Sequence, residues 1–502
     1  MLFSSLEFIF FFLPITLIGF HLIGRQGFKR TAIAWLIAAS LFFYGWWNPP
    51  YLVILLMSAV FNYGTGSFIN KASKQSYKKT LLVIGIVFNL GMLGYFKYAN
   101  FFIYTVNDIG GNNIVLEQII LPLAISFFTF QQIAYLVDVR NDKAEDYSFL
   151  HYSLFVVFFP QLIAGPIVHH KEIFPQFIKD SFFKINSKNL AIGLTIFVVG
   201  LFKKVVLADG ISIYATPVFN AAELGLTLTF FEAWFGALAY TFQLYFDFSG
   251  YSDMAVGIGM MFGIRLPINF NSPYKSLSII DFWRRWHITL SRFLKYYLYI
   301  PLGGSKKGKT RRYVNLMITM LLGGLWHGAG WTFILWGGLH GFYLIINHGW
   351  RSIFKSKTQS KFISTFSWFI TFLAIVIAWV PFRAETIEGA KRMLSGMIGQ
   401  NGISLPRQLK PLGAYIENNI LGTQVLFNDL GTFGSNKGLV FLAILFFIVL
   451  IPKRISYFSQ YEILLEKIKL GASHAFISAL YFYIAIIFIY FGFKTEFLYF
   501  QF

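Results

Sequence analysis

Residues 363–382, ISTFSWFITFLAIVIAWVPF, contain no charged side chain. About 20 apolar residues are enough to cross the hydrocarbon core of a bilayer as a helix. Similar stretches recur along the chain, and 56% of its 502 residues are hydrophobic while only 13% are charged. A soluble domain carries about 25% charged residues. The sequence therefore predicts an all-α, polytopic integral membrane protein with about eleven transmembrane helices, plus re-entrant and interfacial helices.

The chain is strongly basic, with 42 Lys and Arg against 22 Asp and Glu and a formal net charge of +20. In a soluble protein this excess would indicate nucleic-acid binding. Here the cations gather in short loops between apolar stretches, as expected of cytoplasmic loops, so we expect no nucleic-acid partner. The basic loop 303–312 is predicted inside, and the loop 401–436 and both termini are predicted outside.

Cysteine is absent, which excludes disulfides, thiolate metal sites and a cysteine nucleophile. The nine histidines show no HxxxH or HExxH spacing. Because a metal site needs three or four convergent ligands, the sequence predicts no metal.

His327 stands in LLGGLWHGAGW, at the end of an apolar run and between glycines. The glycines permit a helix break that leaves the imidazole at the wall of a cavity. A histidine in a membrane segment is costly unless it is paired or functional, so His327 is either catalytic or hydrogen-bonded between packed helices. His340 repeats this setting in WGGLHG, but in one unbroken helix it would lie about 20 Å away, too far to share a reacting atom.

Residues 281–299, DFWRRWHITLSRFLKYYLY, are predicted to form one helix at the membrane interface. Arg284, Arg292 and Lys295 fall on one face, opposite a face that carries His287. A mere interfacial anchor without chemistry is the alternative.

Asp247 and Asp253, in YFDFSGYSDM, are two carboxylates within the apolar region that comprises the stretches 228–246 and 251–266. They fit a cap at a helix break, an ion site or an orienter for a histidine, and capping by Ser249 or Asp253 is favoured.

The loop 303–312 offers five cations beside a Gly-Gly turn. Its cations could hold the phosphates of a coenzyme. The residues alone favour the simpler explanation that these cations only mark the loop as cytoplasmic.

Six phrases, in this order and spacing, resemble the membrane-bound O-acyltransferase family and most of all its alginate and peptidoglycan O-acetyltransferase branch: FFPQLIAGPIV at 158–168, LFKKVVLAD at 201–209, YFDFSGYSDMAVGIG at 245–259, FWRRWHITLS at 282–291, YLYIPLGG at 297–304 and GGLWHGAGWTFILWGGLHG at 323–341. Before YLYIPLGG the family commonly has tryptophan-leucine-arginine-aspartate, whereas this chain has Phe293, Leu294, Lys295 and Tyr296. The carboxylate of that position is missing, and lysine replaces arginine.

The resemblance implies one domain over 1–502 with a funnel-like core at about 120–350, in the inner membrane of a bacterium. It implies acetyl-CoA as a cytosolic donor, an exported polysaccharide as acceptor and an SGNH-hydrolase-like periplasmic partner. It maps the family's essential histidine onto His327 and its second polar position onto His287. His327 would act as general base. The residues predicted to bind the donor are Arg284, Arg285, Lys306, Lys307 and Lys309.

The aromatic tail 494–502 ends in FLYFQF and carries Tyr499. It resembles the tyrosine-bearing terminus of the small partner protein used in D-alanylation of teichoic acids, which implies that Tyr499 carries the acyl group. An interfacial aromatic belt is the alternative.

Two readings without chemistry stay open for the whole chain. It could be a carrier of the acyl donor or of the polysaccharide, or a scaffold for partner enzymes. The absence of a visible internal repeat counts against a carrier built from inverted repeats.

Overall fold

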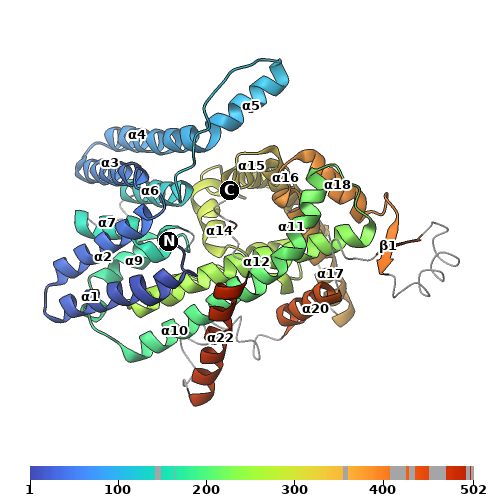
Figure 1. Ribbon diagram of the computed structural model, residues 1–502. Coiled ribbons are helices and arrows are strands. Elements are labelled where there is room, and N and C mark those ends of the chain that lie inside the picture. The colour runs from blue at the N-terminus through green and yellow to red at the C-terminus, as the bar shows by residue number, and fades with distance from the viewer. Residues whose placement is uncertain are drawn as a thin grey trace. The chain divides into compact units, whose positions relative to one another are not determined.

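The computed structural model describes the whole chain except residues 142–147, 164, 354–359, 407–424, 429–435, 452–470, 493–497 and 499–502. Figure 1 shows the helices and strands in chain order by colour. By their contacts, the described residues cluster into two compact units. Unit 1 comprises residues 1–202, 250–269 and 461–490, and unit 2 comprises residues 203–249, 270–460 and 491–502. The expectation of a single domain over the whole length stays a prediction.

Unit 1 is built from helices, which pack as α1 on α2, α3 on α4 and α6, and α7 on α2 and α9. Its elements are η1 (Phe8–Phe12), α1 (Leu13–Arg25), α2 (Lys29–Gly45), α3 (Tyr51–Lys71), α4 (Gln75–Leu93), η2 (Gly94–Tyr98), α5 (Ala99–Gly110), α6 (Ile125–Arg140), α7 (Phe149–Val157), α8 (Phe159–Leu162), α9 (His170–Phe177), η3 (Asp180–Phe183), α10 (Ser187–Phe202) and α22 (Ala472–Phe491), of which Phe491 belongs to unit 2.

Buried amides join the helices of unit 1 where apolar packing alone gives little specificity. Asn89 on α4 donates to the Asn62 side chain on α3 over 2.6 Å, and Gln132 on α6 donates to Ser58 on α3 over 3.0 Å. In a membrane such interhelical hydrogen bonds stabilise helix association.

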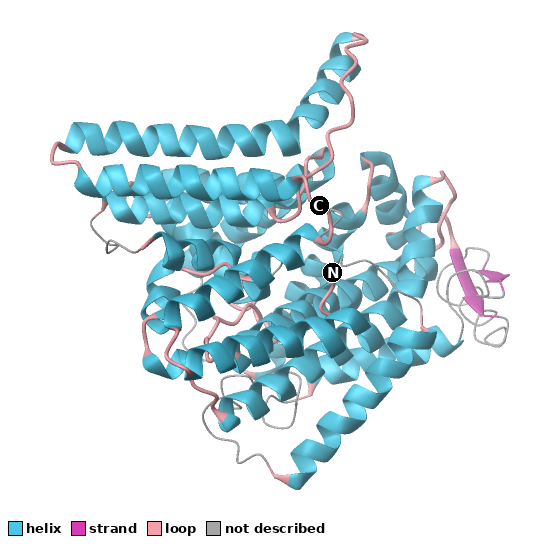
Figure 2. Ribbon diagram, turned by 60° about the vertical axis from the view of Figure 1, so that its left-hand side comes forward, coloured by secondary structure: helices cyan, strands magenta, loops and turns pink. Residues whose placement is uncertain are grey.

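Unit 2 holds most of the second half of the chain, including two short strands. Its elements are η4 (Lys203–Ala208), α11 (Asp209–Glu223), the first part of α12 (Phe230–Met261), η5 (Pro273–Lys275), α13 (Ile279–Trp283), α14 (Ile288–Leu294), η6 (Lys295–Tyr299), α15 (Gly308–His327), α16 (Trp331–Ile353), α17 (Lys361–Arg383), α18 (Ile387–Met397), β1 (Ile403–Pro406), β2 (Val425–Asn428) and α20 (Asn436–Leu450). The strands pair in parallel and are the small exception to the helical class visible in Figure 2.

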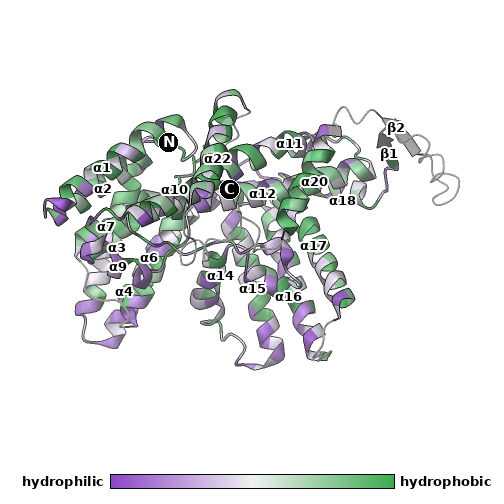
Figure 3. Cartoon of the chain, turned by 90° about the horizontal axis from the view of Figure 1, so that it is seen from below, coloured by the Kyte–Doolittle hydropathy of each residue, from purple (hydrophilic) through white to green (hydrophobic). Residues whose placement is uncertain are grey.

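Within the described residues, six helices are long and apolar enough to cross a membrane: Phe8–Arg25, Tyr51–Lys71, Gln75–Gly110, Ser187–Glu223, Lys361–Arg383 and Ala472–Phe491. Large apolar side chains point outward on them, as Phe362, Phe366 and Phe369 do on α17. In Figure 3 hydrophobic residues, drawn in green, predominate along α17, α20 and α22. The all-α membrane fold is confirmed, and the number of eleven spans stays a prediction.

Helix α12 runs without interruption through YFDFSGYSDM. The predicted helix break there is therefore wrong, and so is the capping role given to Ser249 or Asp253. The stretches 228–246 and 251–266 lie largely on one helix of 32 residues. Asp247 and Asp253 are buried along it, and Asp247 pairs with a lysine that the sequence analysis did not single out.

The segment 281–299 departs from prediction in the opposite way, because it is broken into α13, α14 and the π-helix η6. The prediction of one continuous interfacial helix is wrong. Its division of faces holds, since Arg284, Arg292 and Lys295 are exposed while His287 is buried.

Candidate functional site

His327 is the last residue of α15, and only 4% of it is exposed. The chain turns back over 328–330 and α16 packs antiparallel on α15. Glycines permit this approach: a Cβ on Gly324 would overlap the carbonyl oxygen of Phe333, and one on Gly337 would overlap that of Met320. The predicted helix break beside His327 is confirmed.

His287 lies in the turn between α13 and α14 and is fully buried. Its backbone has φ 40° and ψ 57°, in the left-handed region. For a residue other than glycine this conformation costs about 1–2 kcal/mol, and such strained positions persist where the surroundings enforce them, often at functional sites. The break between α13 and α14 thus serves to direct His287 inward.

The structure brings His287 and His327 together. Their ring centroids lie 6.4 Å apart, and Trp326 contacts both, at 6.2 Å from His287 and 4.9 Å from His327. Phe248 packs edge-on against His287, and Phe382 against His327. Two imidazoles therefore meet inside an aromatic enclosure, and histidine is the side chain most often used for proton transfer.

Burial lowers the pKa of His287 to about 3. The turn that holds it lies outside the candidate membrane spans. At neutral pH its imidazole is uncharged, with one nitrogen that donates and one that accepts. So low a pKa makes His287 a poor general base, whereas its neutral ring can still donate or accept a hydrogen bond.

His340 belongs to the same enclosure. Its Nδ1 accepts a hydrogen bond from Trp283 Nε1 over 3.3 Å, and Trp336 stands between it and His327, with centroids at 4.9 and 5.0 Å. The separation of about 20 Å expected for an unbroken helix is wrong here, because the chain doubles back between the two histidines.

The predicted donor-binding residues fall into two groups. Lys306, Lys307 and Lys309 are exposed at the start of α15, whose first turn contains no acidic residue. Arg284 is also exposed, but Arg285 Nε is paired with Asp281 at 2.9 Å. The lysines are available to an external anion, whereas Arg285 already has a carboxylate partner.

The loop before α15 is shaped by glycines with positive φ: Gly303 (110°), Gly304 (55°) and Gly308 (88°). Asn315 fastens it by donating to the Gly304 carbonyl over 3.0 Å. The positive end of the α15 dipole adds to the lysine charges, which is the setting in which helix amino termini bind phosphate.

Asp247, for which a cap, an ion site or an orienting role was predicted, belongs to a buried ion cluster in unit 2 whose other members the sequence analysis did not single out. Lys204 Nζ lies 2.7 Å from Asp209 Oδ1 and 2.6 Å from Asp247 Oδ1. Asp247 Oδ2 also accepts the backbone N–H of Leu498 over 3.1 Å. Tyr499, the next residue, lies outside the described residues, so its predicted role is untested.

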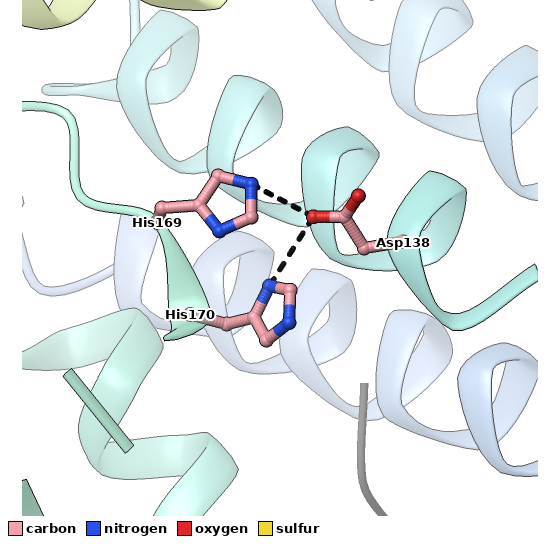
Figure 4. A group of neighbouring side chains, drawn as sticks. All are labelled: Asp138, His169 and His170. Carbon is pink, nitrogen blue, oxygen red and sulfur yellow. Dashed lines mark ion pairs between the residues drawn. The ribbon is translucent and has the colours of Figure 1, made fainter. Parts of the chain in front are cut away.

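Figure 4 shows a second group that the sequence analysis missed, in unit 1. His169 Nε2 and His170 Nδ1 lie 2.8 and 3.4 Å from the same Asp138 oxygen, Oδ2. The signal was the adjacent pair in GPIVHHKE, which helix-based spacing rules do not detect.

Comparison with known proteins fits this geometry. A family model described as MBOAT, membrane-bound O-acyltransferase family, matches residues 74–381, which include both His287 and His327. The chain is 48% identical over 433 residues to the peptidoglycan O-acetyltransferase of Helicobacter pylori, covering 81% of each protein. It is 43% identical over 403 residues to the probable alginate O-acetylase AlgI of Pseudomonas aeruginosa, covering 79% of this chain and 75% of the relative.

A more distant likeness joins it to the teichoic acid D-alanyltransferase of Bacillus subtilis, with 29% identity over 275 residues, 52% of this chain and 67% of the relative. The resemblance predicted from the six phrases is thereby confirmed. The chain belongs to the membrane-bound O-acyltransferase family, and it is an acyltransferase with the helices of a multi-pass membrane protein.

Proposed function

We propose that the chain transfers acetyl groups from cytosolic acetyl-CoA to an exported cell-envelope polysaccharide, in the inner membrane of a bacterium. The observation that carries this proposal is the enclosed pair His287 and His327 in a member of an acyltransferase family. The relatives named for O-acetylation of peptidoglycan and alginate support both acetyl as the acyl group and a glycan as the acceptor.

His327 acts as the general base. Its imidazole takes the proton of an attacking hydroxyl, whose oxygen forms a bond to the thioester carbonyl carbon. The carbon–sulfur bond then breaks, the acetyl group stays on the oxygen, and the departing CoA thiolate takes the proton back from His327. Neutral His287, 6.4 Å away between ring centroids, donates a hydrogen bond that orients the reacting groups, and backbone amides of the glycine-rich flanks stabilise the oxyanion.

Acetyl-CoA is held by its phosphates at the start of α15. Lys306, Lys307 and Lys309 are exposed there, and the helix dipole adds positive potential. The loop faces the cytosol in the predicted topology, on the side where acetyl-CoA is found.

The acetyl group leaves through the tail and a periplasmic partner. The Tyr499 hydroxyl attacks the thioester, CoA is released, and an acetyl-tyrosine ester forms. A serine of an SGNH-hydrolase-like partner then attacks this ester, which returns the tyrosine hydroxyl, and passes the acetyl group to the polysaccharide. The hydrogen bond between Leu498 and Asp247 supports this route, since it holds the residue before Tyr499 at a buried carboxylate of unit 2.

The test is release of free CoA from acetyl-CoA by the purified chain in liposomes, with the partner and glycan fragments supplied. His327→Ala should lower the rate at least about 100-fold, the smaller end of what general-base catalysis contributes. His348→Ala is the matched control, because this half-buried histidine lies on the neighbouring helix α16. Full turnover in His327→Ala would exclude the mechanism, and a wild-type chain that moves glycan without releasing CoA would be a carrier.

A further inference from the structure

Asp138, His169 and His170 form a compact cluster in unit 1 (Figure 4). One ligand atom from each residue, two ring nitrogens and a carboxylate oxygen, lies within 4.8 Å of the other two. The cluster shares no residue with the pair His287 and His327. It therefore calls for an explanation of its own.

Local structure aims the three side chains at one point. Asp138 sits in the last turn of α6, while His169 is the residue before α9 and His170 its first residue. His169 has an extended backbone, with φ −93° and ψ 136°, and the helix begins directly after it. This change of backbone direction lets two adjacent imidazoles, with centroids 4.8 Å apart, address the same carboxylate.

The cluster is largely buried but has one partly exposed member. Asp138 and His170 are buried, at 4% and 2% exposure, and the rings of Tyr135 and Phe174 flank His170 at 6.4 and 6.2 Å. A carboxylate in such surroundings needs compensating positive charge. The His169 side chain is 29% exposed, which provides a path by which a cation can enter.

We propose that Asp138, His169 and His170 bind one divalent transition-metal ion of the Zn²⁺ type. Two imidazole nitrogens and one carboxylate oxygen are a ligand set for Zn²⁺, whereas Mg²⁺ and Ca²⁺ prefer oxygen ligands throughout. In tetrahedral coordination with ligands about 2.1 Å from the metal, two ligand atoms lie about 3.4 Å apart. His170 Nδ1 and Asp138 Oδ2 have this separation, 3.4 Å, and the 2.8 Å between His169 Nε2 and Asp138 Oδ2 has to widen slightly.

The ion fastens the start of α9 to the end of α6. The two ends that the metal joins are distant in the sequence, since Asp138 and His169 are 31 positions apart. A bond through the metal therefore closes a long loop, which stabilises the folded state of unit 1. A fourth position is left for water or a further ligand.

The experiment uses the full-length chain, purified in detergent with an affinity tag that contains no histidine. Metal content is measured by mass spectrometry before and after EDTA treatment. Zn²⁺, Co²⁺ or Mg²⁺ is then titrated into the stripped protein, followed by tryptophan fluorescence during heating. We expect one Zn²⁺ per chain, a melting temperature that rises with Zn²⁺ and Co²⁺ but not with Mg²⁺, and Co²⁺ absorption bands of a nitrogen–oxygen site.

Asp138→Asn and His169→Gln should weaken Zn²⁺ binding at least about tenfold, the lower end of what even outer-shell changes cost. His151→Gln is the matched control, a histidine of the same unit whose ring pairs with Ser148 outside the cluster. His169→Gln at a partly exposed position keeps the test valid if Asp138→Asn fails to fold. Unchanged Zn²⁺ affinity in His169→Gln, or a wild-type chain that neither contains nor is stabilised by Zn²⁺, overturns the proposal and leaves an ordinary hydrogen-bonded cluster.

Discussion

Leu498 donates its backbone N–H to Asp247 Oδ2 over 3.1 Å, and Leu498 is only 5% exposed. The other oxygen of the same carboxylate pairs with Lys204 at 2.6 Å. One buried aspartate in the middle of α12 thus connects the end of the chain with a lysine of η4. Lys204 lies in LFKKVVLAD and Asp247 in YFDFSGYSDM, so two of the phrases typical of the family meet in this cluster.

Asp247→Asn should destabilise unit 2. The amide keeps an oxygen for Leu498 but removes the negative charge beside Lys204, whose ion pair with Asp209 remains. Removing one partner of a buried ion pair costs about 3 kcal/mol or more. The melting temperature in detergent, followed by tryptophan fluorescence, should fall clearly.

Glu388→Gln is the control for this change. Glu388 pairs with Lys391 at 3.5 Å on the surface of the same unit, with both side chains more than half exposed. Exposed pairs contribute at most about 1 kcal/mol. Equal melting temperatures in the two variants would show that the buried cluster contributes no more to stability than an exposed ion pair.

Gly337→Ala should be harmful and Gly338→Ala tolerated, although the residues are neighbours on α16. A Cβ at Gly337 would overlap the Met320 carbonyl oxygen of α15, so the hairpin would have to open at a cost of about 1–3 kcal/mol. A Cβ at Gly338 meets only Leu321 Cδ2 at 3.6 Å, an ordinary contact, and alanine gains up to about 1 kcal/mol of helix propensity. Melting temperature and CoA release should both fall in the first variant and be retained in the second, and loss in both would refute the hairpin packing.

Acid should destabilise the site through His287. Its folded pKa of about 3 lies below the usual value of 6.5, so between these limits the unfolded chain binds a proton that the folded chain does not. Stability contributed by the neutral imidazole is therefore present above pH 6.5 and is lost as pH falls toward 3, at up to about 1.4 kcal/mol per pH unit. His287→Gln cannot titrate, so its melting temperature should fall less steeply over this range, and parallel curves for variant and wild type would contradict the assignment.

The membrane class, the helix break at His327 and the buried face with His287 could be predicted from the sequence, because each follows from local composition. The continuity of α12 could not, since Ser and Asp near Gly indicate a cap unless a partner neutralises the aspartate. That partner, Lys204, is 43 positions away in the sequence. Only tertiary structure reveals such a pairing.

In both the histidine site and the Asp138 cluster, turns between helices bring together residues that are separate in the sequence. His327 and His340 are 13 positions apart in the sequence, yet both contact Trp336 because the chain reverses at Gly328 and Gly330. The cluster of Asp138 with His169 was invisible to spacing rules, which test ligands on one helix only. Sequence patterns predict which residue types carry chemistry, and the turns between helices decide which of them meet.

Charge reversal of Lys306, Lys307 and Lys309 to glutamate should raise the KM for acetyl-CoA. If the loop binds the donor's phosphates, the expected rise is about tenfold or more, the equivalent of about 1.4 kcal/mol, with kcat little changed. The same reversal at Lys71, Lys74 and Lys79, exposed lysines at the turn between α3 and α4, is the control. An equal rise in both would indicate a general charge effect, and no rise in either would remove the loop from the donor site.

Tyr499→Phe should abolish acetylation of the polysaccharide while leaving the chain folded. The ring stays, so an aromatic belt at the membrane interface would be intact, but the hydroxyl that accepts the acetyl group is gone. Asp247 holds the backbone of the preceding residue, Leu498, in unit 2, the same unit that contains His327.

Tyr483→Phe is the matched control for this change, since Tyr483 is 64% exposed on α22, one of the candidate membrane spans. Glycan acetylation is measured as acetate released by mild base from cells, and the acyl-tyrosine is sought by mass spectrometry of the carboxyl-terminal peptide after a pulse of labelled acetyl-CoA. A labelled peptide in the wild type, absent from Tyr499→Phe, establishes the relay. Wild-type levels of glycan acetylation in Tyr499→Phe would instead mean that the hydroxyl deprotonated by His327 belongs to the acceptor or to the partner, and that the tail serves only as an anchor.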